Sequence, residues 1–486
     1  MIDQPQRALV TALVAALLLT GCAAVGPNYV APELAAPATW LGAAAAQVAV
    51  APTAPEDLAT WWRQLADPTL TGLVEQALQT SLDLRAAQAK LREARARRAL
   101  AGAELFPVVS GSATGRRVRA SGEAGGGGTA NLFGAGFDAS WEPDVFGGLR
   151  RGVEAAQANL EASQASLYAV QVSLVAEVGL DFVELRASQA ALDIARANAA
   201  SQAETLQLTQ WRAQAGLTTA LDVEQARANL EQTRAQIPSL ETNRAEAEHR
   251  LEILLGQQPG ALAERLARPG GIPRLPARVT VGIPAEALRQ RPDVQVAERT
   301  LAAETARIGV VEAQAYPNFS LSGSLSLDAL TLGALASGNA VAGSVLGSVA
   351  APIFDAGRVR QQVNIQTAIQ EQALINYEST VLNALAEVES ALVALANTRQ
   401  RQNNLSEALQ AARLAARLAR HRYSAGLIDF QTVLDTERTV LTVEDKLVLG
   451  EADGVKTLIR LYKALGGGWS PVPTNSVAAS AQGTSP

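Results

Sequence analysis

The sequence predicts an α+β membrane protein built from two tandem repeats, in which long helices alternate with short amphipathic strands. Three observations support this fold class. Four separated motifs recur at one constant spacing, two long stretches contain no proline, and segments rich in Ser and Gly alternate polar with apolar residues.

The composition excludes several classes of protein. Of the 486 residues, 48% are hydrophobic, 18% are charged and 4% are aromatic, and the formal net charge is −6. An acidic chain lacks the basic surface that nucleic-acid binding requires. One Cys cannot form an internal disulfide, and with two distant histidines it cannot supply a tetrahedral zinc site. We therefore expect no nucleic-acid partner, no metal and no cofactor.

Residues 1–21 are typical of a lipoprotein signal peptide. Arg7 precedes a twelve-residue apolar run at 8–19, which is too short to span a bilayer as a helix. The four residues that end at Cys22 (LTGC) resemble a bacterial lipobox, in which cleavage before the cysteine leaves its thiol to carry lipid. Ala23, rather than Asp, follows, as in lipoproteins sorted to the outer membrane. We predict that Cys22 is lipidated and anchors the chain in that membrane.

The remainder of the chain contains a tandem duplication. Four pairs of motifs lie 210 residues apart. They are Ser81–Leu84 with Arg291–Val294, Phe106-Pro107 with Tyr316-Pro317, Ala176–Val178 with Ala386–Val388, and Ala215–Leu217 with Ala425–Leu427. Phe146 and Phe354 align at a spacing of 208 residues, which implies a small length change nearby. A spacing held through four anchors indicates two copies of one structural unit.

This duplication divides the chain into segments. After the signal peptide, we expect an N-terminal anchor segment at 22–80, repeat 1 at 81–256, a linker at 257–290, repeat 2 at 291–465 and a C-terminal tail at 466–486. Each repeat is expected to contain a helix, two strands and further long helices. The strands are expected at about 105–142 and about 316–352.

Both repeats contain a stretch that can be helical almost throughout. No proline occurs from Asp144 to Ile237 or from Ile353 to Ser470. In the first stretch, apolar residues recur every seven positions and then shift by four, which is typical of a coiled coil with a stutter. They are Leu160, Leu167, Leu174, Val178, Leu185 and Leu192. A helix of about 60 residues would reach roughly 90 Å, which is longer than a bilayer requires.

The sections between the helices have the period of two that is typical of strands. In the second repeat, Phe319, Leu321, Leu325 and Leu327 alternate with serines, and in the first, Phe133, Ala135, Phe137, Ala139 and Trp141 alternate with Gly, Asp and Ser. The lengths of these sections suit a tilted membrane strand, which needs about ten residues. A soluble sheet with one buried face would show the same alternation. The lipoprotein signal favours membrane strands.

Four strands cannot close a barrel wide enough to conduct. In lipid, an open sheet edge leaves unpaired backbone N–H and C=O groups, each of which costs several kcal/mol. We therefore predict that other copies of the chain complete the sheet, although this argument does not give their number.

Several motifs resemble those of the TolC-type outer membrane factors, in particular the NodT-like lipoprotein branch. They are CAAVGPNYVAP from Cys22, Trp61-Trp62, Asp67-Pro68, WEPDVFG from Trp141, RPDV from Arg291, Tyr316-Pro317 with Phe319-Ser320, PIFDAGR from Pro352 and ALGGGW from Ala464. The resemblance extends from the signal to about Trp469. It implies a homotrimer in which a 12-strand outer-membrane β-barrel continues into a 12-helix periplasmic α-barrel. It also places 22–80 and 257–290 in an equatorial region.

The resemblance also implies a function. TolC-type factors are passive exit ducts of tripartite efflux pumps, fed by a periplasmic adaptor and an inner-membrane transporter, often of the resistance–nodulation–division type. An exit duct for type I protein secretion is the alternative within the family, and a lipid-anchored periplasmic coiled-coil scaffold is the alternative outside it. An enzyme is disfavoured, because the run Gly125–Gly128 lacks the lysine of a phosphate-binding loop and His249 and His421 have no nearby nucleophile.

Family members close the duct at its periplasmic tip, and the resemblance implies residues for such a gate. Asp435 corresponds by position to a constriction-ring carboxylate, Arg438 to its partner in the gate, and Asp222 with Tyr423 to a polar tether between helix pairs. Gln431 stands where related sequences often have an apolar residue. Three copies of Asp435 would form a negative ring that binds cations. The alternative is an ordinary surface ion pair between Asp435 and Arg438.

Two glycines are predicted to mark the turns of the helical hairpins. Gly216 and Gly426 fit such turns because glycine permits the left-handed conformation. We expect both turns to contact the adaptor, and the alternative is that they serve only as turns.

Overall fold

The computed structural model describes residues 24–33, 36–50, 58–121, 123, 128–268, 270–276 and 279–470. The predicted signal peptide, Cys22 and residues 471–486 of the tail lie outside this part of the chain. The chain divides into two compact units. The strand unit comprises residues 1–33, 90–164 and 295–379, and the hairpin unit comprises residues 34–89, 165–294 and 380–486.

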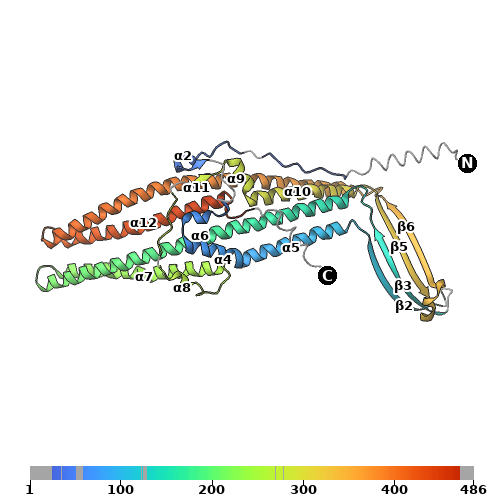
Figure 1. Cartoon of the computed structure of the whole chain (residues 1–486), viewed down its shortest axis with the longest axis horizontal. Helices are drawn as coiled ribbons and strands as arrows, with labels where there is room; N and C mark the ends of the chain where they lie inside the picture. Colours follow the sequence, from blue (N-terminus) through green and yellow to red (C-terminus); the bar gives the residue numbers. More distant parts are fainter. Residues whose placement is uncertain are drawn as a thin grey trace, which may run out of the picture. The chain divides into compact units, whose positions relative to one another are not determined.

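The two repeats form helices of equal length (Figure 1). Helices α5 (Leu82–Ala103) and α10 (Pro292–Ala313) have 22 residues each. Helices α6 (Gly148–Gln214) and α11 (Arg358–Ser424) have 67 each, and α7 (Ala220–Leu254) and α12 (Phe430–Ala464) have 35 each. In every pair, the two starting residues are separated by the same interval as the sequence motifs. This agreement confirms the predicted duplication, and at 1.5 Å per residue α6 and α11 reach about 100 Å.

Four strands of the strand unit form one antiparallel sheet in the order β2-β3-β5-β6, drawn side by side in Figure 1. They are β2 (Val108–Arg119), β3 (Thr129–Trp141), β5 (Asn318–Ala329) and β6 (Val341–Ala350). The pairing of β3 with β5 joins the two repeats. Among the described residues, β2 and β6 are the edges of the sheet.

The alignment of Phe146 with Phe354 is wrong. The equivalent positions are Gly147 and Gly357, which are separated by the interval of the other motifs and immediately precede the long helices, with φ angles of 79° and 80°. Phe146 stacks on Tyr316, whereas Phe354 is 90% exposed. The repeats therefore have no net length difference in this region, because the loops on either side of β6 make up for its shorter length of 10 residues, against 13 in β3.

Short elements surround the hairpin unit's core. They are α2 (Ala43–Ala46), β1 (Ala49–Val50), the 3-10 helix η1 (Trp61–Leu65), α4 (Pro68–Thr80), α8 (Ala263–Leu266), β4 (Thr280–Val281) and α9 (Pro284–Gln290). Strand β1 pairs in parallel with β4. In the core, Trp61 stacks on Tyr462, with 5.4 Å between ring centroids, and Phe182 is fully buried. The strand unit adds two 3-10 helices, η3 (Leu332–Ala336) and η4 (Gly338–Ala340), between β5 and β6.

Candidate functional site

One face of the four-stranded sheet is apolar and exposed. Directly opposed residues of antiparallel strands share a face, and the register pairs odd-numbered with odd-numbered residues throughout. Phe137 therefore lies opposite Leu325, and their exposed fractions are 65% and 59%. This face also includes Val109, Ala113, Phe133, Ala135, Ala139, Trp141, Phe319, Leu321, Leu327, Val341, Val345 and Val349. An apolar surface of this kind is typical of contact with lipid.

The even-numbered face carries most of the hydroxyl groups of the sheet, and its larger apolar residues are Val108, Val118, Leu132 and Leu346. The Ser320 and Ser348 Oγ atoms lie 2.6 Å apart, and the Ser324 and Ser344 Oγ atoms lie 2.8 Å apart. Asp138 lies opposite Ser110 and Ser324 on the same face. The predicted alternation thus extends across all four strands, and the sheet has one mainly apolar face and one more polar face.

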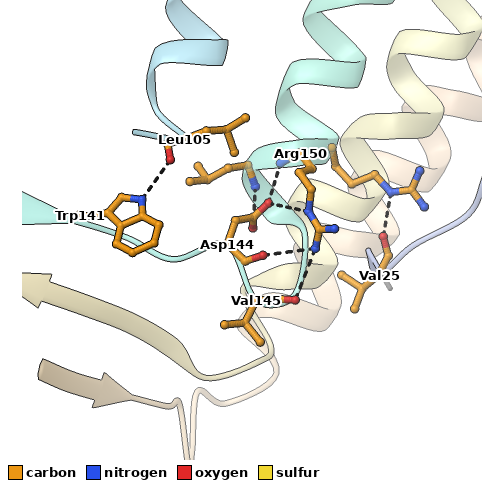
Figure 2. A network of polar contacts seen from close by, with 8 residues as sticks. Val25, Leu105, Trp141, Asp144, Val145 and Arg150 are labelled. Carbon is orange, nitrogen blue, oxygen red and sulfur yellow. Dashed lines mark hydrogen bonds and ion pairs between the residues drawn. The ribbon is translucent and has the colours of Figure 1, made fainter. Parts of the chain in front are cut away.

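Aromatic and capping residues mark the junction where the strands meet the helices (Figure 2). The Trp141 indole N–H donates to the Leu105 carbonyl at 3.0 Å. The Asp144 carboxylate accepts from the backbone N–H groups of Leu149 and Arg150, and so caps the start of α6. Phe146 stacks on Tyr316 at 4.7 Å. Trp and Tyr are enriched at membrane–water boundaries, so this junction is the expected boundary of the membrane strands.

Residues 24–33, here called the N-terminal strap, are bound at this junction by a buried arginine. Arg151 is 5% exposed, and its guanidinium donates to the carbonyl oxygens of Val25 and Gly26 and to Asn28 Oδ1 at 2.8 to 3.0 Å. Glu154 pairs with the remaining side of the guanidinium at 2.7 Å. In return, the Val25 N–H donates to a backbone carbonyl just before α6. Figure 2 shows the bond to the Val25 carbonyl.

Glycines let the strap lie directly against the helices. A Cβ at Gly147 would be 2.4 Å from Ala24 Cβ, and one at Gly309 would be 2.7 Å from the Val25 carbonyl oxygen. Further along, the Tyr29 hydroxyl donates to Glu298 at 3.1 Å. Because Cys22 is the second residue before Ala24 in the chain, a lipid on Cys22 would be attached directly next to the bound strap.

The two predicted turns lie at the ends of the hairpins α6–α7 and α11–α12. Gly216 and Gly426 both have a φ of 72°, and nothing lies within 4 Å of a Cβ built on either. The N–H of Leu217 donates to the Arg212 carbonyl, and the N–H of Leu427 donates to the Arg422 carbonyl. This pattern closes a helix with a left-handed glycine. The positions of both turns are therefore as predicted, whereas an adaptor contact stays a prediction.

The Asp222 side chain forms hydrogen bonds that cap the start of α7. Its carboxylate accepts from the Thr219 N–H at 3.0 Å and from the Thr218 hydroxyl, and the Thr219 hydroxyl accepts from the Asp222 N–H. This reciprocal arrangement is a capping box. The hydrogen bond from Thr218 lowers the pKa of the Asp222 carboxyl.

Tyr423 packs inside the tip and does not bond to Asp222 within the chain. Its ring is 9% exposed, lies 5.3 Å from the Phe430 ring and has the Arg212 guanidinium 4.5 Å above it. Its hydroxyl has no hydrogen-bond partner among the described residues. The predicted tether is therefore not formed within one chain, and only a tether to another copy stays a prediction.

Asp435 and Arg438 also have separate partners. The Gln431 side-chain amide donates to Asp435 Oδ1 at 2.9 Å, and this pair is exposed. Arg438 Nε donates to Asn229 Oδ1 at 2.9 Å and so links α12 to α7. The alternative of an ordinary Asp435–Arg438 ion pair is wrong for the single chain, because the arginine points to the other hairpin.

The sequence reasoning missed a charge ladder inside the second hairpin. Arg420 binds Glu437 at 2.9 Å, and Arg413 binds Glu444 at 2.7 Å. Both pairs are symmetric about the turn and recur at heptad spacing on each helix, a pattern that could have been found in the sequence. Glu437 is 7% exposed and borders a cavity of about 710 Å³ between α6, α11 and α12. Burial raises the pKa of the Glu437 carboxyl, and Arg420 partly offsets this rise.

Together, a sheet with one lipid-compatible face, long helical hairpins and a strap behind a predicted lipid anchor define the protomer of an envelope channel. The model of the family described as "Outer membrane efflux protein" matches residues 73–257 and 283–467. The chain belongs to this family, and the two matched segments are offset from each other by the same interval as the repeats.

Individual relatives agree with this assignment. The chain is 33% identical over 460 residues to Nodulation protein T of Rhizobium leguminosarum bv. trifolii, covering 94% of this chain and 96% of that protein. It is 33% identical over 472 residues to the pyoverdine export outer membrane protein OpmQ of Pseudomonas aeruginosa, with the same coverage. The solved outer-membrane channel OprN is 37% identical, with a TM-score of 0.86 over 92% of this chain and 100% of that one.

These findings confirm the resemblance, the outer-membrane location and the role in efflux. The chain is the outer membrane component of an efflux pump, which works with a periplasmic adaptor and an inner-membrane transporter. Its fold is that of a two-repeat TolC-type channel protomer.

Proposed function

We propose that three copies of the chain close into a 12-strand barrel continuous with a 12-helix periplasmic barrel, forming a passive exit duct. The open sheet carries this proposal. Edges β2 and β6 lack partners among the described residues while the odd-numbered face is exposed and apolar. In lipid, such edges must be paired, and neighbouring copies provide the pairing.

The long helices support the same assembly. Helices α6 and α11 each contain an 18-residue stretch apolar enough to span a membrane, yet only 44% and 28% of these stretches are buried within the chain. Each helix is about three times as long as a spanning helix of about 20 residues needs to be. Packing against the helices of neighbouring copies would cover these stretches in an α-barrel.

We assign small-molecule efflux rather than type I protein secretion to the duct, together with a transporter of the resistance–nodulation–division type. The relative OpmQ is named for the export of pyoverdine, and this name favours efflux. In this assembly, Asp435 forms the constriction ring, Arg438 and Gln431 position the ring, and Tyr423 offers its hydroxyl to a neighbouring copy. The turns at Gly216 and Gly426 contact the adaptor, and lipid on Cys22 holds the strap at the membrane.

Reconstitution tests the proposed duct. The purified chain should migrate as a trimer that resists denaturing gel conditions, and it should conduct ions in planar bilayers. A protein that is monomeric and monodisperse without detergent and silent in bilayers would support the periplasmic scaffold instead.

A further inference from the structure

We infer that Arg117 and Arg119 form a binding site for the phosphate groups of lipopolysaccharide at the outer border of the membrane. The inference rests on the proposed membrane barrel and assigns a lipid partner to its outer surface. Both residues belong to β2 and have odd numbers, so the register places them on the apolar face. They are therefore charged residues on the side of the sheet that faces lipid.

Their height on the sheet corresponds to the lipid headgroups. Along β3, the apolar series on this face runs from Trp141 to Phe133 and ends there, because Asn131 and Thr129 follow. At about 3.3 Å per residue, this series extends about 26 Å along the strand. With the usual strand tilt, the apolar band is about 20 Å tall, close to that of outer-membrane barrels. Arg117 lies opposite Asn131, and Arg119 lies opposite Thr129, just beyond the band.

The chain order identifies this end as the outer one. Helix α5 leads into the start of β2, and β3 leads into α6, so the helices join the opposite end of the strands. In an outer membrane protein with periplasmic helices, the hairpin loops then face outward. The outer leaflet there consists largely of lipopolysaccharide, whose lipid A moiety bears phosphates.

Neither the sheet nor the neighbouring copy in the proposed barrel supplies an acidic partner for these arginines on their face. Both side chains are exposed and form no ion pair with the described residues. In the proposed barrel, β2 would adjoin β6 of a neighbouring copy. Residues 330–350, which hold β6 and the loop before it, contain no charged residue at all. Asp328, near the same end of the sheet, belongs to β5, which is not a neighbour of β2, and it lies on the even-numbered face.

Arginine suits such a ligand. The guanidinium binds phosphate in a bidentate manner and stays charged at every physiological pH. Two arginines at alternate positions on one face can hold one phosphate each or share one. The same strand also provides a matched control, because Arg116 has the same chemistry but lies on the even-numbered face.

The experiment compares the full lipidated chain with Arg117→Gln/Arg119→Gln and with Arg116→Gln. Binding of purified lipid A to each trimer is measured by native mass spectrometry in detergent, with phosphatidylcholine as the reference lipid. We expect the wild type to prefer lipid A and the double variant to lose about 25-fold in affinity, about fivefold for each arginine at an anionic membrane surface. The Arg116→Gln variant should bind like the wild type, and inorganic phosphate at millimolar concentration should not displace the lipid.

Several outcomes would overturn the inference. They are equal binding by the double variant, an equal loss in Arg116→Gln, or no preference for lipid A in the wild type. Displacement by inorganic phosphate would indicate a simple anion site. The duct is assessed separately on the same samples, because trimer migration and conductance should be intact in all three proteins. Loss of the trimer in the wild type would contradict the proposed duct itself.

Discussion

Asp435 retains an uncompensated negative charge at the hairpin tip. Gln431 donates a neutral hydrogen bond to it, and Arg438 points to Asn229 instead. Three symmetric copies of this carboxylate would attract cations into the duct. We predict that Asp435→Ala weakens block by divalent cations at least about tenfold in single-channel recordings, since three charges leave the ring together.

Asp453→Ala is the matched control for this experiment. Asp453 lies on the same helix but pairs with Arg401 at 3.4 Å. Its removal should leave cation block unchanged. A channel of Asp435→Ala with wild-type conductance and block would remove Asp435 from the gate.

Glu437 gives the tip a pH dependence. Burial raises the pKa of its carboxyl above the ordinary value of 4.5, so the folded chain holds this proton more tightly than the unfolded chain does. Its contribution to stability is therefore present below pH 4.5 and is lost as the pH rises through the folded pKa. We predict that the Glu437→Gln variant does not lose this stability as the pH rises. The check is the temperature at which the wild-type and variant trimers dissociate, measured as a function of pH. Parallel pH profiles of the two proteins would contradict the prediction.

Glycines that a turn requires could be predicted from the sequence, whereas a single contact between helices far apart in the chain could not. Gly216 and Gly426 were found because a left-handed turn selects glycine. The partners of Asp222 and Arg438 were not found. Asp222 follows Thr219 at capping-box spacing, which competes with any tether, and the contact of Arg438 with Asn229 spans 209 residues of sequence.

The N-terminal strap is an element without regular secondary structure that is nonetheless tightly bound. Arg151 alone satisfies three oxygen acceptors of the strap. We predict that Arg151→Ala frees the strap, because three acceptors of the strap then lose charge-assisted hydrogen bonds, which are worth about 1.5–3 kcal/mol each at most. Protease cleavage within the strap, at residues 24–33, should become faster, while lipidation of Cys22 should persist.

Two comparisons define this result. Glu154→Ala removes the ion pair on the far side of Arg151. The strap should stay bound in this variant, since Glu154 binds the guanidinium and not the strap. Cys22→Ser should abolish lipid attachment and membrane retention of the unassembled chain. A strap that is equally protected in Arg151→Ala would contradict its assigned role.

The two hairpins are equal in length but not in packing. Helix α12 buries fourteen residues, among them Phe430, Val433 and Leu434, whereas α7 buries seven and contains Pro238. The proline-free interval in the sequence therefore underestimated the helix, since α7 continues through Pro238. Proline removes one helical hydrogen bond, and the length of the helix on both sides compensates for that loss.

The turn at Gly426 tests the adaptor contact. Open space surrounds the position of its missing Cβ, so a large side chain fits without disturbing the hairpin, apart from the strain of a positive φ. We predict that Gly426→Trp still forms trimers but impairs efflux severalfold in cells, because the bulky group blocks a docking partner. Gly260→Trp, at another open glycine with positive φ, is the control. Equal efflux by both variants would show that Gly426 is only a turn.

At the scale of the whole molecule, the sequence contains the repeat, the strands and the helices but not the number of copies. Periodicity reports on which side of each element is apolar, and this was sufficient to predict both faces of the sheet. Closure depends on strand tilt and on contacts between chains, which leave no periodic signal within one chain. The number three therefore came from the family resemblance.

Cross-linking between the sheet edges tests closure most directly. The chain is made with Ser112→Cys in β2 and one cysteine in β6, at Ala342, Ser344, Leu346 or Ser348, all on the even-numbered face. If β6 of each copy pairs with β2 of the next, oxidation of one combination yields a covalent trimer and nothing larger on a denaturing gel. Monomers in every combination, or a ladder that continues beyond three copies, would contradict the closed duct.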